Sequence, residues 1–162
     1  VAMGPAFITV IGQCMGNRDT EAAEYYFKKL TKLTLLLSSA WNLFVFLLTP
    51  LFLQFYALAS ETKQLVIWLV LIHNVFNAFA FPFSGALSSG LRAAGDVRFT
   101  MYVSVGCTVA VRLLLSYVLS IILDMGVMGI AAAMVCDWVA RAVIFAVRLK
   151  SGKWKEFQVI SE

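Results

Sequence analysis

Four long apolar stretches occupy most of this chain, and they constrain its fold more than any other feature. They cover about residues 33–56, 65–91, 99–123 and 127–149. Each is long enough to cross the hydrocarbon core of a bilayer as a helix, which takes about 20 residues. Since only helices and closed barrels satisfy all of their backbone groups in lipid, the pattern predicts an all-α, multi-pass integral membrane protein.

The composition agrees with this class and counts against two others. Of the 162 residues, 61% are hydrophobic and 14% are charged, with a mean hydropathy of +0.86. Soluble domains are about half apolar and a quarter charged. The net charge of +4 forms no basic face interleaved with aromatic residues, so we expect no nucleic-acid binding. The three cysteines lack metal-ligand spacing, so no metal site is expected either.

The segments outside the four stretches also have distinct characters. Residues 1–15 form an apolar run too short to cross a membrane, which we interpret as the end of a helix that starts upstream. The sequence is therefore expected to be part of a longer protein. Residues 21–32 are predicted to form an amphipathic helix along the membrane surface, and residues 150–162 a basic tail.

The positive charges predict the orientation of the spans. Loops alternate sides, so residues 15–32, residues 92–98 and the tail share one face, and the opposite face holds only Lys63. By the positive-inside rule the crowded face is cytoplasmic, which predicts a multi-pass plasma (inner) membrane protein with a cytoplasmic C-terminus. The crowded face holds ten basic residues: Arg18, Lys28, Lys29, Lys32, Arg92, Arg98, Arg148, Lys150, Lys153 and Lys155.

Arg112 and Asp137 are charged residues inside the last two stretches. They lie equally far from the turn near residue 124, so an ideal helical hairpin places both roughly 18 Å below its outer end. Asp137 could pair with Arg112, or with Arg141 one turn along its own helix. Two interpretations stay open: a salt bridge that holds the hairpin together, or a group in a proton or substrate path. A path residue predicts that Asp137→Asn reduces export more than membrane abundance.

His73, Asn74 and Asn77 form a polar stripe on one helical face of the second span. At this depth a polar stripe lines either a cavity or a helix–helix contact. His73 could titrate near neutral pH and couple protons to a transport cycle, or it could simply donate an interhelical hydrogen bond. Asn42 beside Trp41 is a weaker form of the same signal in the first span.

The sequence contains no pattern typical of an enzyme. It has no HExxH, no P-loop and no GxSxG, and a single histidine cannot complete a metal or nucleophile site. We therefore expect no catalytic residues and no energy supply from nucleotide hydrolysis.

Two polar loops and the tail resemble a known family. IGQCMGNRDTEAA, residues 11–23, resembles the "vGq-xx-G-xx-d-xx-a" loop of the multidrug and toxic compound extrusion (MATE) transporters. LRAAGDVRFT, residues 91–100, resembles the "LRaaGDvrft" loop late in that family, and SGKWK, residues 151–155, is similar to the short tail of bacterial members. We expect residues of these loops to have structural or hinge roles, and the glycines among them to pack closely or end helices. The residues are Gly12, Gln13, Gly16, Arg92, Gly95 and Asp96.

The resemblance implies a fold of two six-helix lobes around a central cavity. Residues 1–162 would be the C-terminal part of the second lobe, with the short run as the eighth helix and the four spans as the ninth to twelfth. Family members exchange Na⁺ or H⁺ for cationic, apolar compounds by alternating access. The implied partners are the lipid bilayer, the missing N-terminal half of the same protein and small-molecule cationic substrates, with no cofactor beyond the coupling ion.

One departure from the family bears on ion coupling. Some members carry an acidic cation-site residue in the tenth helix, whereas the second span here has none, so coupling would depend on groups elsewhere or on Asp137.

Two alternatives to an exporter remain. One is a lipid-linked saccharide flippase of the same superfamily, for which an unpaired Arg112 would suit a pyrophosphate headgroup. The other is a non-transporting membrane scaffold subunit, which requires the polar stripe to be wholly buried between helices.

Overall fold

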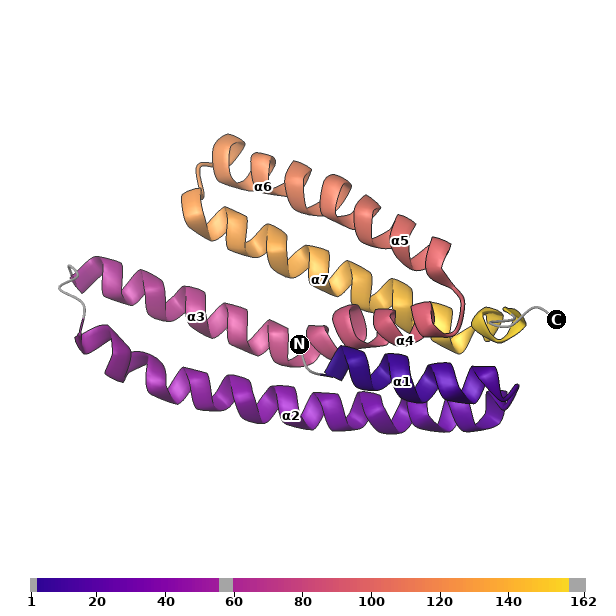
Figure 1. Cartoon of the computed structure of the whole chain (residues 1–162). Coiled ribbons are helices and arrows are strands. Elements are labelled where there is room, and N and C mark those ends of the chain that lie inside the picture. Colours follow the sequence, from indigo (N-terminus) through magenta and orange to yellow (C-terminus); the bar gives the residue numbers. More distant parts are fainter. Residues whose placement is uncertain (1–2, 56–59, 158–162) are drawn as a thin grey trace.

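Helices make up nearly all of the part of the chain that the computed structural model describes, residues 3–55 and 60–157, and these ranges contain no strand (Figure 1). Residues 1–2 of the short apolar run, residue 56 of the first stretch and residues 158–162 of the tail lie outside the described residues. Four helices are long and apolar enough to span a membrane, so the all-α membrane class is confirmed. The α-helices are α1 (Met3–Gly16), α2 (Thr20–Gln54), α3 (Ser60–Phe81), α4 (Leu87–Ala93), α5 (Val97–Gly106), α6 (Leu114–Tyr117) and α7 (Gly126–Lys150).

Helix α2 joins the charged lead-in to the first span without a break. It runs for 35 residues, or about 52 Å, which is longer than the hydrocarbon core. Asp19 caps its start by accepting a hydrogen bond from the backbone N–H of Ala22 at 2.9 Å. Residues 21–32, predicted as an amphipathic helical lead-in, are helical, and good helix formers and a single cap let the same helix continue into the first span.

Helices α3 and α4 are parts of one continuous rod that widens in its middle. Between them Pro82–Ala86 form a π-helical turn, closed by the backbone N–H of Leu87 donating to the carbonyl of Pro82. Proline has no backbone N–H, so it leaves the preceding turn one donor short, and a wider turn accommodates the loss. The predicted second span therefore forms, but not as a regular α-helix.

Helices α5 and α6 form an arm that packs mainly on α7 (Figure 1). Two π-helical segments, Cys107–Leu113 and Val118–Ile122, interrupt this arm. The arm turns into α7 through Asp124 and Gly126, both with positive φ (51° and 53°), as turn chemistry predicts. Most of the large apolar side chains of the arm are exposed, as contact with lipid requires.

The bundle is tightly packed at the end where its three basic segments meet. The α1–α2 turn, the α4–α5 turn and the start of the tail lie together there, and the end of α2, the start of α3 and the α6–α7 turn lie at the other end (Figure 1). This arrangement agrees with the predicted grouping of loops. We call the buried cluster near this end the packed end; it consists of Phe7, Ile11, Met15, Ala23, Phe27, Ala86, Leu87, Leu91, Ala94, Phe145 and Trp154.

Gly90 and Trp154 show how closely the packed end is assembled. A Cβ atom on Gly90 would lie 2.4 Å from the ring of Phe27 and 2.9 Å from that of Phe7, so only glycine lets α4 approach α1 and α2. Trp154 is fully buried, stacks edge-on against Phe27 at 4.9 Å, and donates its indole N–H to the carbonyl of Leu149 at 3.0 Å. Trp154 therefore fixes the start of the tail against the helices of the packed end.

Candidate functional site

A cleft of about 490 Å³ opens between α2, α3 and α7, away from the packed end. Its size suits a drug-like ligand, and most of its walls are apolar with a few polar groups. All three residues of the predicted polar stripe line it. The full lining is Trp41, Asn42, Val45, Leu69, Val70, Ile72, His73, Asn74, Asn77, Ala131, Met134 and Val135.

His73 lies at the boundary between α3 and α7. Its ring meets that of Trp138 on α7 edge-on, with centroids 5.0 Å apart and planes at 76°. The side chain is otherwise exposed, and among the described residues it is the one ionisable group in the lining of the cleft.

Asn42 and Asn77 connect α2 with α3 at the floor of the cleft. Asn77 Nδ2 donates to Asn42 Oδ1 at 3.5 Å, and Asn42 Nδ2 donates to the carbonyl of Ser38 at 2.7 Å. Thr34, one further turn along α2, is buried on the same face and donates to the carbonyl of Leu30. The sequence analysis missed this continuation of the stripe, although the i, i+4 spacing of residues 34, 38 and 42 was a readable signal.

A second cavity, of about 510 Å³, lies on the other side of the Asn42–Asn77 contact, toward the start of α1. Trp41, Asn42 and Asn77 line both cavities. The two cavities therefore follow one another along the α2–α3 groove, and the asparagine pair stands between them. The second cavity is lined by Met3, Thr34, Leu37, Ser38, Trp41, Asn42, Asn77 and Phe81.

Asn74 differs from the other two asparagines in having no partner for its amide nitrogen. The residue is 7% exposed, and Nδ2 is buried and donates no hydrogen bond to any described part of the chain. It borders the main cleft and also a smaller cavity of about 310 Å³ on the opposite side of the α2–α3 contact. An unpaired buried amide costs free energy, so this position has an unused capacity to bind.

Asp137 is fully buried and pairs with Arg141, one turn along α7, rather than with Arg112. Asp137 Oδ1 and Arg141 Nε have no hydrogen-bond partner among the described residues. None of these residues appears in the lining of the main cleft. Of the two pairings expected from the sequence, the structure has the local one.

The π-helical segments change the geometry on which the expected alignment of Arg112 with Asp137 depends. Arg112 lies inside the π-helical segment Cys107–Leu113, and a second such segment separates it from the turn. A π-helical turn holds more residues than an α-helical turn, so both the rise and the direction of the side chains depart from the ideal count. Arg141 and Asp137 also lie on the same helix, so their ion pair forms without a second helix having to be held in place.

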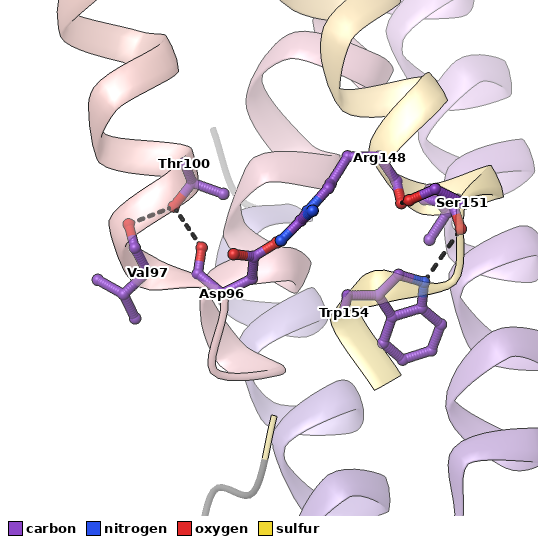
Figure 2. A network of polar contacts seen from close by, with 7 residues as sticks. Asp96, Val97, Thr100, Arg148, Ser151 and Trp154 are labelled. Carbon is purple, nitrogen blue, oxygen red and sulfur yellow. Dashed lines mark hydrogen bonds and ion pairs between the residues drawn. The ribbon is translucent and has the colours of Figure 1, made fainter. Parts of the chain in front are cut away.

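Asp96 forms a long-range contact at the packed end, although the sequence suggested only local turn bonding. Its side chain is 2% exposed and accepts a hydrogen bond from Arg148 Nε at 2.7 Å, an ion pair across 52 positions of sequence (Figure 2). The guanidinium of Arg148 also lies 4.5 Å from the ring centre of Phe99. Thr100 donates its hydroxyl to the carbonyls of Asp96 and Val97, which fixes the start of α5.

The remaining loop residues are placed as follows. Gly95 has φ of 98°, which only glycine adopts readily, and Gly16 is the last residue of α1. A Cβ on Gly12 would meet nothing within 4 Å, so the expectation of close packing at this glycine is wrong. Gln13 is exposed and Arg92 donates to the hydroxyl of Ser89 at 3.2 Å.

The structure assembles no group of three or more potential metal ligands within the residues it describes. The comparison with protein families gives one match: the family model described as MatE covers residues 1–118, which is well over half of the chain. No solved structure matches the chain.

Proposed function

This chain belongs to the MatE family of membrane transport proteins, and from that premise we propose that it acts in the secondary active export of cationic or apolar drug-like compounds. In this proposal Na⁺ or H⁺ moves inward in exchange for the substrate, in a plasma (inner) membrane with the tail in the cytoplasm. The chain supplies the C-terminal part of one of two six-helix lobes. The rest of the same protein supplies the other side of the pathway.

The polar cleft carries this proposal. A drug-sized hollow with three asparagines and a histidine, set in otherwise apolar helices, is what a transport pathway for amphiphilic compounds needs. A non-transporting scaffold would require the polar stripe to be wholly buried between helices. Although Asn42 and Asn77 do join α2 to α3, His73 is exposed and the stripe lines an open cleft, which argues against that alternative.

The proposed mechanism is rocking of the lobe about a site near the membrane midplane. The packed end and the Asp96–Arg148 ion pair join α1, α2, α4 and α7 into one unit, so these helices would move together. The cleft at the other end would open and close against the second lobe. We call the region of the main cleft and the second cavity the hollow end. The division of one bundle into a packed end and a hollow end supports rigid-body motion rather than local unfolding.

His73 is the proposed proton carrier, because no other ionisable group lines the cleft in the part of the chain that the structure describes. The cleft has no carboxylate for Na⁺, although asparagine oxygens could contribute ligands. The direct test is ethidium export from cells that express the intact protein, measured with a protonophore present and, separately, without Na⁺. Loss with the protonophore and a reduced pH dependence in His73→Gln support the proposal, and unchanged export under both conditions contradicts ion antiport.

A lipid-linked saccharide flippase receives less support from the geometry. It needs a cationic cavity, whereas Arg112 lies on the arm and is absent from the linings of the main cleft and the second cavity. The same membranes can be tested for translocation of a fluorescent undecaprenyl pyrophosphate saccharide. Translocation with no ethidium export would favour the flippase.

A further inference from the structure

One face of α2 carries two exposed lysines beside an exposed tyrosine, just before the apolar part of the helix begins. We propose that Tyr25, Lys29 and Lys32 bind the phosphate of an anionic phospholipid, whose acyl chains lie along the apolar side chains that continue the same face. We call Tyr25, Lys29, Lys32 and Leu36 the lysine stripe. This inference goes beyond the proposed function and does not depend on which compounds the protein exports.

The length of α2 fixes the depth of the two lysines. From Leu33 to its last residue, Gln54, the helix carries no charged side chain and rises about 33 Å, close to the roughly 30 Å thickness of the hydrocarbon core. Lys32 directly precedes this stretch, so it lies where the hydrocarbon ends, and Lys29 lies about one turn further out. Long lysine side chains extend toward the headgroups at such a boundary, so both ammonium groups reach the depth of the lipid phosphates.

The lysine stripe faces away from the packed end. Its four members are spaced by three or four residues, so they share one helical face, and all four are exposed. Ala23, Phe27 and Thr34 are buried, and with about 3.6 residues per turn they lie on the opposite side of α2. The exposed face continues along the helix through Leu43 and Leu47. The stripe therefore forms the headgroup end of a face that is otherwise apolar.

No carboxylate of the described chain neutralises the charges of the stripe. Within residues 3–55 and 60–157, Lys29 and Lys32 form no ion pair. Glu24, the carboxylate closest to them in sequence, is occupied by Lys28 and Lys155. A phosphatidylcholine headgroup brings its own positive charge to such a place, whereas phosphatidylglycerol brings none. The charge of the stripe therefore favours the anionic lipid.

Tyr25 and Glu21 mark the outer limit of the site. The ammonium group of Lys29 lies 5.6 Å from the ring centre of Tyr25, so a cation–π contact keeps this charge on the stripe. The exposed phenol can also donate a hydrogen bond to a phosphate oxygen, as tyrosines in the headgroup region do. Glu21 lies about 12 Å from Lys29 along the helix axis, beyond the distance at which salt screens exposed charges.

Quenching of one fluorophore on the stripe measures lipid selection at the site itself. In the intact protein with its other cysteines replaced, Leu36→Cys is labelled with bimane and reconstituted into vesicles of phosphatidylcholine and phosphatidylglycerol. In each series only one of the two lipids has brominated acyl chains, so quenching gives their relative affinities. We expect a preference for phosphatidylglycerol of about 5- to 25-fold, which is about 5-fold for each lysine that takes part.

Two double substitutions separate the charge of the stripe from its other properties. Lys29→Gln with Lys32→Gln should reduce the preference to less than about 2-fold, because both charges are lost. Lys29→Arg with Lys32→Arg keeps both charges and should keep the preference. All of these changes are at exposed positions, so the fold should tolerate them.

A matched control removes two other lysines from the same end of the molecule. Lys28 is paired with Glu24, and Lys153 lies on the tail, so Lys28→Gln with Lys153→Gln should leave the preference at residue 36 unchanged. A bimane at Val105→Cys, an exposed position of the arm, serves as the control for location. Its quenching should not respond to the substitutions in the stripe.

Three results would overturn the inference. The first is equal affinity of the two lipids at residue 36, or a preference that survives Lys29→Gln with Lys32→Gln. The second is an equal fall in preference with the control pair, which would indicate a general effect of positive charge. The third is the absence of quenching by either lipid, because protein would then cover this face of α2.

Discussion

The two ends of this bundle use similar residue types in opposite ways. At the packed end Trp154 is fully buried against Phe27, and Gly90 removes the last space between helices. At the hollow end Trp41 is 66% exposed, and the helices beside it enclose cavities. Side chains of the same chemistry therefore hold one end together and line cavities at the other, and position in the fold decides which.

This difference teaches where motion can occur. A close-packed core does not deform continuously, so helices joined there move as a unit. Helices separated by cavities have fewer contacts to break, so the hollow end can change its shape more cheaply. The same chain can then carry both a rigid base and an adaptable binding surface.

Truncating one tryptophan at each end gives the largest expected contrast. Trp154→Ala should lower the free energy of unfolding by about 4 kcal/mol, because a fully buried ring and its bond to Leu149 are lost. Trp41→Ala should cost about 1 kcal/mol or less, because the ring is largely exposed. Thermal unfolding of the purified protein in detergent measures both, and equal losses would remove the distinction between the ends.

Asp137→Asn tests whether the buried Asp137–Arg141 ion pair stabilises the fold or takes part in transport. Removing one partner leaves Arg141 charged in a mostly buried site, so we expect a loss of roughly 3 kcal/mol and a parallel fall in membrane abundance and export. The double variant Asp137→Asn with Arg141→Gln should recover abundance. Export that falls well below abundance in the single variant would instead assign Asp137 to the transport path.

Two glycine substitutions test the packing more finely. Gly90→Ala should destabilise the protein by about 1–3 kcal/mol, because the new methyl group overlaps the rings of Phe27 and Phe7. Gly12→Ala is the matched control in α1, where the methyl group meets open space and better helix propensity should add up to about 1 kcal/mol. The comparison uses the same unfolding measurement, and a harmless Gly90→Ala would show that the packed end has unused room.

The smallest expected effect is the pH dependence of the tail contact. Hydrogen bonds from Lys155 and then Lys28 lower the pKa of Glu24 from 4.5 to about 2. The stabilisation is therefore present above pH 4.5 and is lost as the pH falls from there toward 2. Because Glu24 is exposed, the shift in melting temperature should be small and should disappear in high salt. Glu24→Gln should abolish it, and the same pH dependence in that variant would exclude this ion pair as the cause.

The sequence predicts the spans and the stripe because both depend on local periodicity. Apolar runs define the four long helices, and the spacing of residues 73, 74 and 77 places them on one face that lines the cleft. The order of polar loops also predicts which turns lie together. These features need only the geometry of one helix at a time.

The contacts that sequence reasoning missed depend on how helices meet. Asp96 and Arg148 are 52 positions apart, and no spacing rule connects them. The choice between Arg112 and Arg141 as the partner of Asp137 could not be made from the sequence, because π-helical turns change the rise and no proline signals them in the arm. The burial of Trp154 could not be predicted either, because it depends on helices far away in the sequence.

Thiol labelling tests the central distinction most directly. In the intact protein, with Cys14, Cys107 and Cys136 replaced by alanine, single cysteines are introduced as His73→Cys and Asn77→Cys at the cleft and as Ala94→Cys and Phe145→Cys at the packed end. In native membranes a water-soluble methanethiosulfonate should modify both cleft positions and leave both packed-end positions unmodified, since Ala94 and Phe145 are fully buried. Cleft cysteines that stay unreactive while those at the packed end are modified would contradict the account.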